Sequence, residues 1–349
     1  MKYSRVYINS MAYELAPEVV SSKDLESRLA PLYQKLRIPS GQLAALTGIE
    51  DRRWWPAKHR LSDGAIEAAK KSLDETGIDI KEIGAVVYTG VCRDQHEPAT
   101  ACRIAAELGV NTSTAIYDIS NACLGVLSGI LDIANRIELG QIKAGLVVSC
   151  ESARHIVDIT IENMLSDPSI QNFSQSLATL TGGSGAVAVL LTDGSFSMDN
   201  HKQHKLLGAS HLSAPEHHDL CKWGFQEVGL KLHREFMRTN AVPLLKEGVA
   251  LAADTWKHFL NNHQWTIDSV DKVICHQVGS ANQKQVLTAL GIPSEKEYPT
   301  YQYLGNMGTV SLPVTAAIAH ENGFLQKGDK VSFLGIGSGL NCMMLGLEW

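Results

Sequence analysis

The chain has 349 residues, of which 44% are hydrophobic and 19% are charged, and its formal net charge is −6. This length exceeds one ordinary core and suits two fused domains, and the composition is typical of a well-packed globular protein. Because the chain has no basic block, the charge argues against nucleic acid or an anionic membrane as the main partner.

The first residues, MKYSRVYINS, lack the apolar run of a secretion signal, and the longest apolar runs are too short to span a membrane. Seven cysteines, none in a CxxC pair, stand at positions 92, 102, 123, 150, 221, 275 and 342. We therefore expect a cytoplasmic protein with reduced thiols and no zinc site. The His-rich stretch 201–218 lacks paired ligand spacing, and we interpret it as a polar loop without a metal.

In chain order, apolar strands are predicted at residues 82–90, 114–120 and 143–150, and helices at residues 100–110 and 123–140. The strands are apolar throughout rather than alternating. This rhythm predicts an α/β protein in which buried parallel strands are covered by helices on both faces.

The second half of the sequence resembles the first when the chain is shifted by about 185 positions. Asn121 then falls on Asn306, and the strand at 145–150 falls on residues 330–335. One register that serves several elements indicates an internal duplication, although chance similarity between strand–helix pairs is the alternative.

We place the two halves at residues 1–195 and 196–349. A site between them would use equivalent loops beyond the carboxyl ends of the strands, where ligands of open α/β sheets bind. These loops contain Cys123, Asn306, Glu97 and His276.

Cys123 follows SNA and precedes a helix that begins near Leu124. A helix N-terminus favours the thiolate, so we expect a pKa below the ordinary value, and its N–H groups can hold an oxyanion. The alternative is a buried structural cysteine.

His276 directly follows an apolar strand, and Asn306 lies between two glycines in GNMG. The alternatives are a hydrogen-bonded core histidine and a turn asparagine. Glu97 precedes Pro98, so it could instead be a charge that complements the dipole of the following helix. The glycine-rich loop at 335–341 leads into a strand, which excludes a dinucleotide loop and favours a bend that brings N–H groups near a ligand.

The ordered set of Cys after SNA, His after a strand, Asn in GNMG and a terminal Gly-rich loop resembles the thiolase superfamily, specifically its ketoacyl synthase III branch. The resemblance covers the whole chain and implies the five-layered αβαβα thiolase fold. The chain reads HQVGSAN where that branch typically reads HQAN. The CRDQHEPATAC and HQVGS segments look instead like the acyl-CoA condensing enzymes of long-chain olefin biosynthesis.

This resemblance implies that Cys123, His276 and Asn306 are catalytic and that the Cys123 and Ser338 N–H groups form the oxyanion hole. It implies a non-decarboxylative Claisen condensation of two long-chain acyl-CoA molecules to a 2-alkyl-3-keto acid, with no cofactor besides the coenzyme A thioester substrates. In a homodimer, Glu97 would reach the partner's site as the base, in a desolvated tunnel. Downstream olefin-pathway enzymes are possible partners, and the coenzyme A contacts are not assigned.

Three other functions remain open at this stage. The nearest is a decarboxylating 3-oxoacyl-acyl carrier protein synthase III that uses a malonyl thioester and needs no base. A non-catalytic partner subunit would not need the Cys–His–Asn set, and an acyltransferase to a non-carbon acceptor would not need Glu97.

Overall fold

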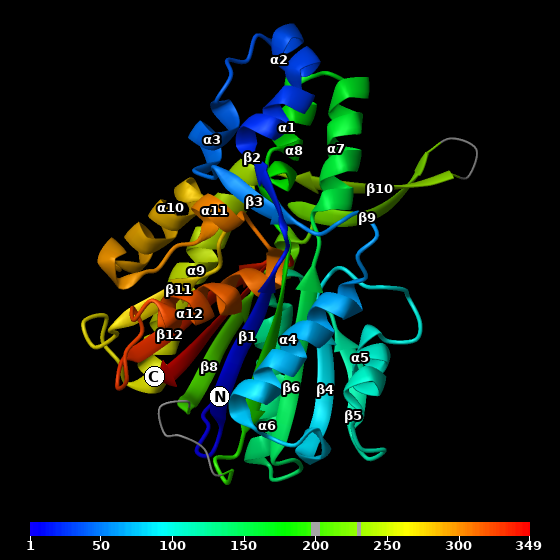
Figure 1. Ribbon diagram of the computed structural model, residues 1–349. Coiled ribbons are helices and arrows are strands. Elements are labelled where there is room, and N and C mark those ends of the chain that lie inside the picture. The colour runs from blue at the N-terminus through cyan, green and yellow to red at the C-terminus, as the bar shows by residue number, and fades with distance from the viewer. Residues whose placement is uncertain (197–202, 229–231) are drawn as a thin grey trace.

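The computed structural model describes residues 1–196, 203–228 and 232–349. Within these residues, nine strands form one sheet in the order β11-β12-β13-β8-β1-β7-β6-β4-β5 (Figure 1). Their bounds are β1 (Tyr7–Leu15), β4 (Ile83–Thr89), β5 (Ala115–Ile119), β6 (Ala144–Glu151), β7 (Gly185–Thr192), β8 (His204–Ser213), β11 (Lys272–Cys275), β12 (Lys330–Gly337) and β13 (Asn341–Glu348).

The two halves of this sheet repeat one arrangement. In the first half β4 is parallel to β6, and β6, β7 and β1 are antiparallel in turn. In the second half β11 is parallel to β12, and β12, β13 and β8 are antiparallel in turn. A single parallel bridge between Val273 and Glu297 takes the place of β5. Such repetition is what an internal duplication predicts, and the boundary at residue 195 stays a prediction.

Three layers of helices enclose the two half-sheets. The outer layer on the first half contains α4 (Leu61–Thr76) and α5 (Thr100–Leu108), the outer layer on the second contains α9 (Ala241–His263) and α10 (Ser280–Leu290), and the middle layer contains α6 (Gly125–Glu138) and α12 (Ser311–Glu321). Val86 and Tyr88 of β4 pack in the outer core, whereas Ala85 and Val87 pack in the core of the middle layer. The predicted five-layered αβαβα arrangement is therefore observed.

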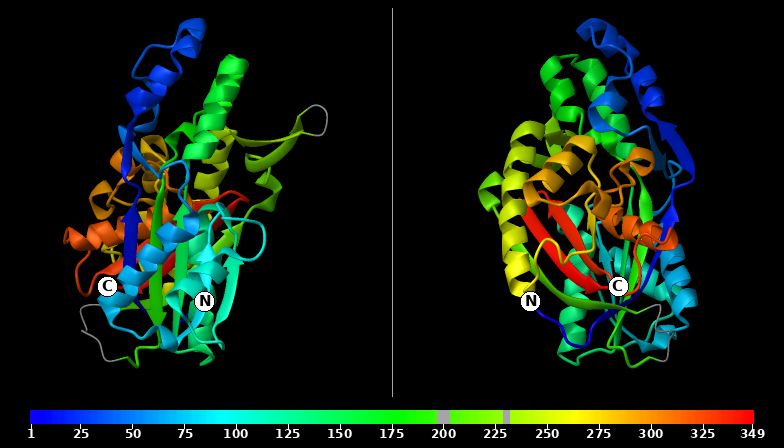
Figure 2. Two further views of the ribbon diagram at one scale, coloured as in Figure 1. Left: turned by 45° about the vertical axis from the view of Figure 1, so that its right-hand side comes forward. Right: turned by 90° about the vertical axis from the view of Figure 1, so that its left-hand side faces the viewer.

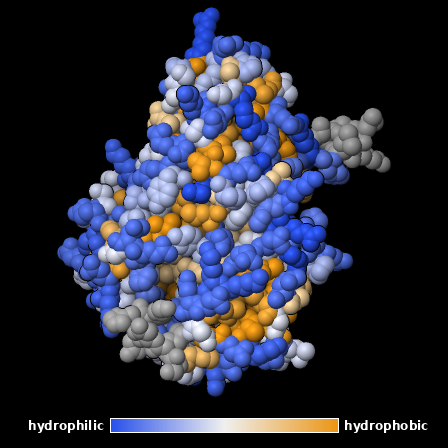
Figure 3. Space-filling view, viewed as in Figure 1, coloured by the Kyte–Doolittle hydropathy of each residue, from blue (hydrophilic) through white to orange (hydrophobic). Residues whose placement is uncertain are grey.

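The middle helices differ from the outer ones in how they are buried. In α12, the nine consecutive residues 311–319 are buried, because this helix lies between the two half-sheets. In contrast, α4 buries one face, which includes Ala65 and Ala69, and its outer side is hydrophilic in Figure 3. Helix α6 agrees with the predicted helix at 123–140, except that a short 3-10 turn, η2 (Ala122–Leu124), precedes it.

A cap lies above the carboxyl ends of the parallel strands (Figures 1 and 2). It contains β2 (Glu18–Ser21), α1 (Ser22–Arg28), α2 (Ala30–Leu36), α3 (Gln42–Thr47), β3 (Asp51–Trp54), α7 (Arg154–Ser166), α8 (Ile170–Ser176) and the hairpin of β9 (Cys221–Val228) and β10 (Leu232–Thr239). Two shorter elements of the second half, α11 (Tyr301–Leu304) and η7 (Gly308–Val310), come just before α12 in the chain.

The interpretation of residues 201–218 as a polar loop is wrong for residues 204–213, whereas residues 214–218 lie in the connection that follows. His204–Ser213 form β8 in the middle of the sheet, because this strand pairs with both β1 and β13. His201 lies outside the described residues. Among the described residues, no group of three or more His, Cys, Asp or Glu side chains could hold a metal ion, and no helix is long and apolar enough to cross a membrane.

Candidate active site

A cavity of about 750 Å³ lies where the two halves and the cap meet, and its size is that of a small-molecule site. Cys123, His276, Asn306 and Ser338 all line it. Most other lining side chains are apolar, and they include Leu46, Ile156, Trp223, Phe236, Leu244 and Val249. Four residues predicted from four separate parts of the sequence are thus brought together at one surface.

The turn that carries Cys123 has an unusual backbone. Ala122, the residue before it, has a φ of +43°, a left-handed conformation that costs a non-glycine residue roughly 1–2 kcal/mol. The turn is locked from the second half of the chain, because Thr309 Oγ1 accepts a hydrogen bond of 2.7 Å from the Val126 N–H. Cys123 is therefore held in place by contacts between both halves.

Burial raises the pKa of the Cys123 thiol to about 12, and nearby Cys221 and Glu151 act in the same direction. The expectation of a lowered pKa is therefore wrong for the unliganded protein. Two features explain the difference. The thiol faces an apolar cavity from η2 rather than from the first turn of α6, and the Val126 N–H of that turn already binds Thr309. Cys123 is a thiol in the resting protein.

His276 directly follows β11, and its N–H donates to the Leu334 carbonyl at 3.0 Å. Burial lowers the pKa of the imidazole to about 4, so the ring is neutral at physiological pH. Its Nδ1 has no hydrogen-bond partner among the described residues. A neutral imidazole carries one donor and one acceptor nitrogen, so His276 can both donate to an oxygen and accept a proton.

Asn306 is fixed by its own backbone and by two glycines. Its Oδ1 accepts the Gly308 N–H at 3.0 Å, and its N–H donates to the Thr181 carbonyl at 2.9 Å. Gly305 has a φ of +68°, and a Cβ there would lie 2.6 Å from the Thr181 oxygen, so glycine is required. Since Oδ1 is engaged, the Asn306 amide is oriented with its Nδ2 donor left for a ligand.

One side chain links the His276 turn to the segment that leads to Asn306. Gln277 Oε1 accepts the N–H groups of Thr300 at 2.9 Å and Tyr301 at 3.2 Å. Its Nε2 donates to the Cys275 carbonyl at 2.8 Å. The spacing between His276 and the Asn306 segment is therefore set by a buried amide, which the sequence analysis did not identify.

The Gly-rich loop forms the turn between β12 and β13, as predicted. Gly337 lies against the turn that carries Cys123, because a Cβ at position 337 would be 3.5 Å from the Cys123 nitrogen. Ser338 follows and lines the cavity. The loop thus passes beside the Cys123 N–H, and the role of the Ser338 N–H stays a prediction.

Glu97 does not line the cavity of its own chain, and it is exposed. The expectation of a desolvated carboxylate is therefore not met within a single chain. The alternative, in which Glu97 is the charge at the N-terminus of α5, is not observed either. Asp118 accepts the N–H groups of Thr100 at 2.9 Å and Ala101 at 3.0 Å, so a different carboxylate occupies the α5 N-terminus.

Glu151 is a buried, cavity-lining carboxylate that the sequence analysis missed. It accepts the N–H groups of Val91 at 3.0 Å and Cys92 at 3.2 Å, and burial raises its pKa. The signal was present, because Glu151 directly follows the apolar strand predicted at residues 143–150, as His276 follows its own strand.

Comparisons with known proteins agree along the whole chain. Residues 46–202 match the family described as Thiolase, N-terminal domain, and residues 260–349 match 3-Oxoacyl-[acyl-carrier-protein (ACP)] synthase III C terminal. An acyl-CoA:acyl-CoA alkyltransferase of Shewanella oneidensis is 77% identical over all of both chains. A beta-ketoacyl-[acyl-carrier-protein] synthase III of Koribacter versatilis is 27% identical over 99% of this chain and 98% of its own.

Solved structures of OleA from Xanthomonas campestris are similar as well. One, a variant with a substituted glutamate, has a TM-score of 0.93 at 33% identity and covers 100% of this chain and 98% of its own. Another has serine in place of a cysteine and contains lauric acid and lauroyl-CoA. Its TM-score is 0.92 at 33% identity, with 99% of this chain and 100% of its own covered.

Proposed function

The chain belongs to the family of acyl-CoA:acyl-CoA alkyltransferases in the thiolase superfamily, and we propose that it joins two long-chain acyl-CoA molecules through an acyl-Cys123 intermediate. The reaction is a non-decarboxylative Claisen condensation. The product is a 2-alkyl-3-keto acid, which later enzymes of olefin formation would consume. The observation that carries this proposal is the convergence of Cys123, His276 and Asn306 on one apolar cavity.

In the first step, the Cys123 sulfur attacks the thioester carbonyl of one acyl-CoA. Because the resting thiol has a high pKa, its proton leaves as the new C–S bond forms rather than beforehand. Neutral His276 can accept that proton and return it to the departing coenzyme A sulfur. The carbonyl oxygen becomes an oxyanion, which the N–H groups of Cys123 and Ser338 would stabilise by about 3–4 kcal/mol each.

In the second step, another acyl-CoA loses an α-proton to become an enolate. Its carbonyl oxygen would accept hydrogen bonds from His276 and from Asn306 Nδ2, which Gly308 leaves free. A malonyl thioester generates this carbanion by losing CO₂, but a plain acyl-CoA needs a base. We assign that base to the partner subunit's Glu97, because Glu97 is exposed and lies outside its own cavity.

The enolate carbon then attacks the acyl-Cys123 carbonyl, the C–S bond breaks, and the sulfur regains a proton. Hydrolysis of the remaining thioester with water releases coenzyme A and the keto acid. The apolar cavity walls suit the alkyl chains, since apolar side chains bind apolar chains by excluding water.

A homodimer is part of this proposal. Within the part of the chain that the structure describes, strand β5 is the last strand of the sheet and pairs only with β4, and all five of its residues are partly exposed. An open edge of this kind is a template for pairing with another chain. The Glu97 loop joins β4 to α5, which packs beside β5. A second copy paired at β5 would therefore lie near Glu97.

The proposal is tested by mixing two inactive variants, Cys123→Ala and Glu97→Gln. In a mixed dimer, one site combines an intact Cys123 with an intact Glu97 from the other chain. Unfolding and reassembling the two together should restore about a quarter of the wild-type condensation, because half of random two-fold dimers are mixed and one of their two sites is complete. No restoration after verified reassembly would contradict action between subunits.

The family reaction itself is checked by mass spectrometry of the product from one long acyl-CoA alone. A keto acid, or the ketone formed from it, with two joined chains is expected. A requirement for a malonyl thioester, with release of CO₂, would instead identify a decarboxylating synthase.

A further inference from the structure

The loop that presents Glu97, residues 90–99, is held to the body of the protein by carboxylates at its beginning, middle and end. At the beginning, Glu151 accepts the Val91 and Cys92 N–H groups. At the end, Asp118 accepts the N–H groups of the first residues of α5. The third carboxylate, Asp94, is the closest of these to Glu97 in sequence.

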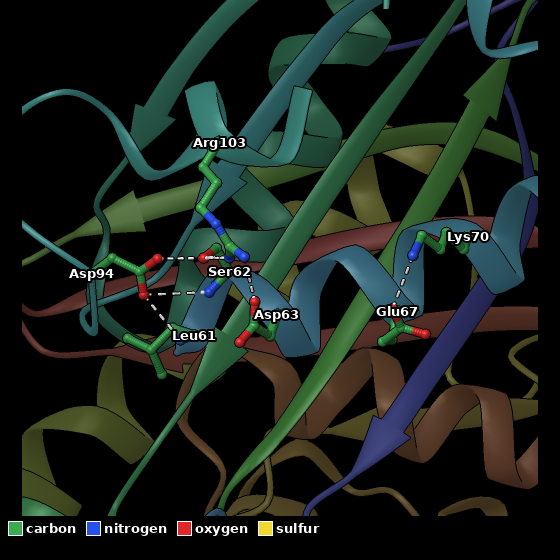
Figure 4. A network of polar contacts seen from close by, with 7 residues as sticks. All are labelled: Leu61, Ser62, Asp63, Glu67, Lys70, Asp94 and Arg103. Atoms are coloured by element: carbon green, nitrogen blue, oxygen red, sulfur yellow. Dashed lines mark hydrogen bonds and ion pairs between the residues drawn. The ribbon is translucent and has the colours of Figure 1, made fainter. Parts of the chain in front are cut away.

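Asp94 attaches the middle of the loop to the beginning of α4. Its Oδ1 accepts the N–H groups of Leu61 at 2.9 Å and Ser62 at 3.3 Å, and its Oδ2 accepts the Ser62 hydroxyl, as Figure 4 shows. Arg103 of α5 donates to the same hydroxyl and pairs with Asp63 at 2.6 Å. This network therefore ties the loop to both outer helices, α4 and α5.

The contact replaces an ordinary helix cap. Arg60, at the N-cap position of α4, makes no side-chain cap, so Asp94 supplies the acceptor from a distant part of the chain. A carboxylate here also interacts favourably with the positive end of the helix dipole. Because a local Ser or Asp at position 60 would cap the helix without the loop, the observed arrangement gives α4 and the loop a shared anchor.

Glu97 itself has no hydrogen-bond or ion-pair partner among the described residues. Its neighbours therefore set its position. We infer that Asp94, together with Ser62 and Arg103, is a positioning residue that fixes Glu97 for entry into the partner's cavity. This inference rests on the proposed role of Glu97. A misplacement of about 1 Å can cost about 100-fold in rate, so the anchor should matter for condensation.

The first test is Asp94→Ala, with acylation and condensation measured separately. Release of coenzyme A in the first turnover should stay near the wild-type rate, because Glu97 takes no part in that step. Condensation should fall about 10–100-fold. Asp94→Asn should recover much of it, since asparagine also caps helices. Asp79→Ala is the matched control, because Asp79 also caps a helix, the short 3-10 helix Ile80–Glu82, by accepting the Lys81 N–H at 2.9 Å. Asp79→Ala should leave the ratio of the condensation rate to the acylation rate unchanged.

The second test uses mixed dimers of Cys123→Ala and Glu97→Gln chains. Asp94→Ala is added either to the Cys123→Ala chain, which donates Glu97, or to the Glu97→Gln chain. Condensation should be about 10–100-fold lower in the first placement than in the second. Equal activity in the two placements would overturn the positioning role, because a general folding defect does not depend on which chain carries it.

Failure of the two proposals can be told apart. If the parent pair restores no activity, Glu97 does not act between subunits, and the positioning role toward the partner's cavity fails with it. If the parent pair restores activity but the ratio of condensation to acylation is unchanged in Asp94→Ala, the positioning role alone fails. If Asp94→Ala does not fold, Ser62→Ala removes the shared hydroxyl and keeps the carboxylate. An unchanged ratio in that variant would contradict the inference.

Discussion

Two asparagines at equivalent places in the two halves have different surroundings. Asn121 and Asn306 each stand in the turn before a middle-layer helix, 185 positions apart. Asn121 Nδ2 donates to Ser128 Oγ at 2.9 Å, and its Oδ1 accepts from Asn341 at 3.3 Å. Among the described residues, the side chain of Asn306 makes a hydrogen bond only through its Oδ1, which accepts from Gly308. The side chain of Asn121 is therefore engaged at both ends within the fold, whereas that of Asn306 keeps its amide donor for the role that we propose.

The other pair of equivalent loops differs in length and burial. After β11, His276 follows at once and is buried. After β4, a loop of ten residues carries Glu97 to the surface. The loop of the second half thus places His276 at its own chain's cavity, whereas the equivalent loop of the first half places Glu97 away from that cavity.

The largest effect should come from the turn of the first half. Cys123→Ser should lower turnover by at least about 1,000-fold, because a serine hydroxyl is a much weaker nucleophile than a thiol and His276, with its pKa lowered to about 4, is a weak base for the hydroxyl proton. Intact-mass spectrometry after exposure to acyl-CoA measures the covalent adduct directly. More than a few per cent of wild-type adduct formation and turnover in the serine variant would mean that another residue is the nucleophile.

The asparagine pair is the next test. Asn306→Ala should lower condensation by about 10²–10³-fold, because it removes a donor to the enolate oxygen. It should affect Cys123 acylation much less. Asn121→Ala should instead destabilise the fold by about 1–3 kcal/mol, because Ser128 and Asn341 lose their partner. Chemical denaturation and single-turnover coenzyme A release separate the two effects. Equal losses in the condensation rate from Asn121→Ala and Asn306→Ala would mean that the two asparagines do not differ in role.

The fold and the loops of the site could be predicted because they depend on local pattern. Continuous apolar strands, helical stretches and the 185-residue shift are all visible without contacts. Their placement in loops made Cys123, His276 and Asn306 candidates, the resemblance to the thiolase superfamily joined them into one set, and all three line one cavity in the structure.

What could not be predicted depends on contacts between distant residues. The raised pKa of Cys123 follows from burial by the cap and both halves. The strand β8 is recognisable only from its pairing with β1 and β13. The Asp94 anchor joins residues 32 or more positions apart, and no local spacing encodes it.

The buried ring of His276 should make the protein less stable in acid. Its pKa is about 4 when folded, against an ordinary value of 6.5, so the unfolded chain binds a proton first as the pH falls. Stability from this group is fully present above pH 6.5 and is lost toward pH 4. Between pH 7 and 5 the loss is about 2 kcal/mol.

His276→Asn should lack that part of the acid loss, and urea unfolding at several pH values measures it. His204 and His263 also have pKa values lowered by burial, to about 3 and about 4. The quantity to compare is therefore the slope of unfolding free energy against pH in the variant and in the wild type. Parallel stability curves from pH 7 to 5 would show that His276 is protonated in the folded protein.

The smallest effect concerns Ala122 and Met307, which hold equivalent positions in the turns before α6 and α12. Ala122 has a φ of +43°, whereas Met307, 185 positions later, has a φ of −89°. Glycine adopts the left-handed region freely, so Ala122→Gly should raise the free energy of unfolding by up to about 1 kcal/mol, the relieved strain exceeding the added chain entropy. Ala106→Gly is the matched control, because Ala106 is exposed in α5 and should lose about 0.5–1 kcal/mol. Thermal unfolding of both variants shows whether each substitution raises or lowers the free energy of unfolding. A loss of equal size at both positions would mean that Ala122 carries no strain, and that the two turns differ only in the side chains they present.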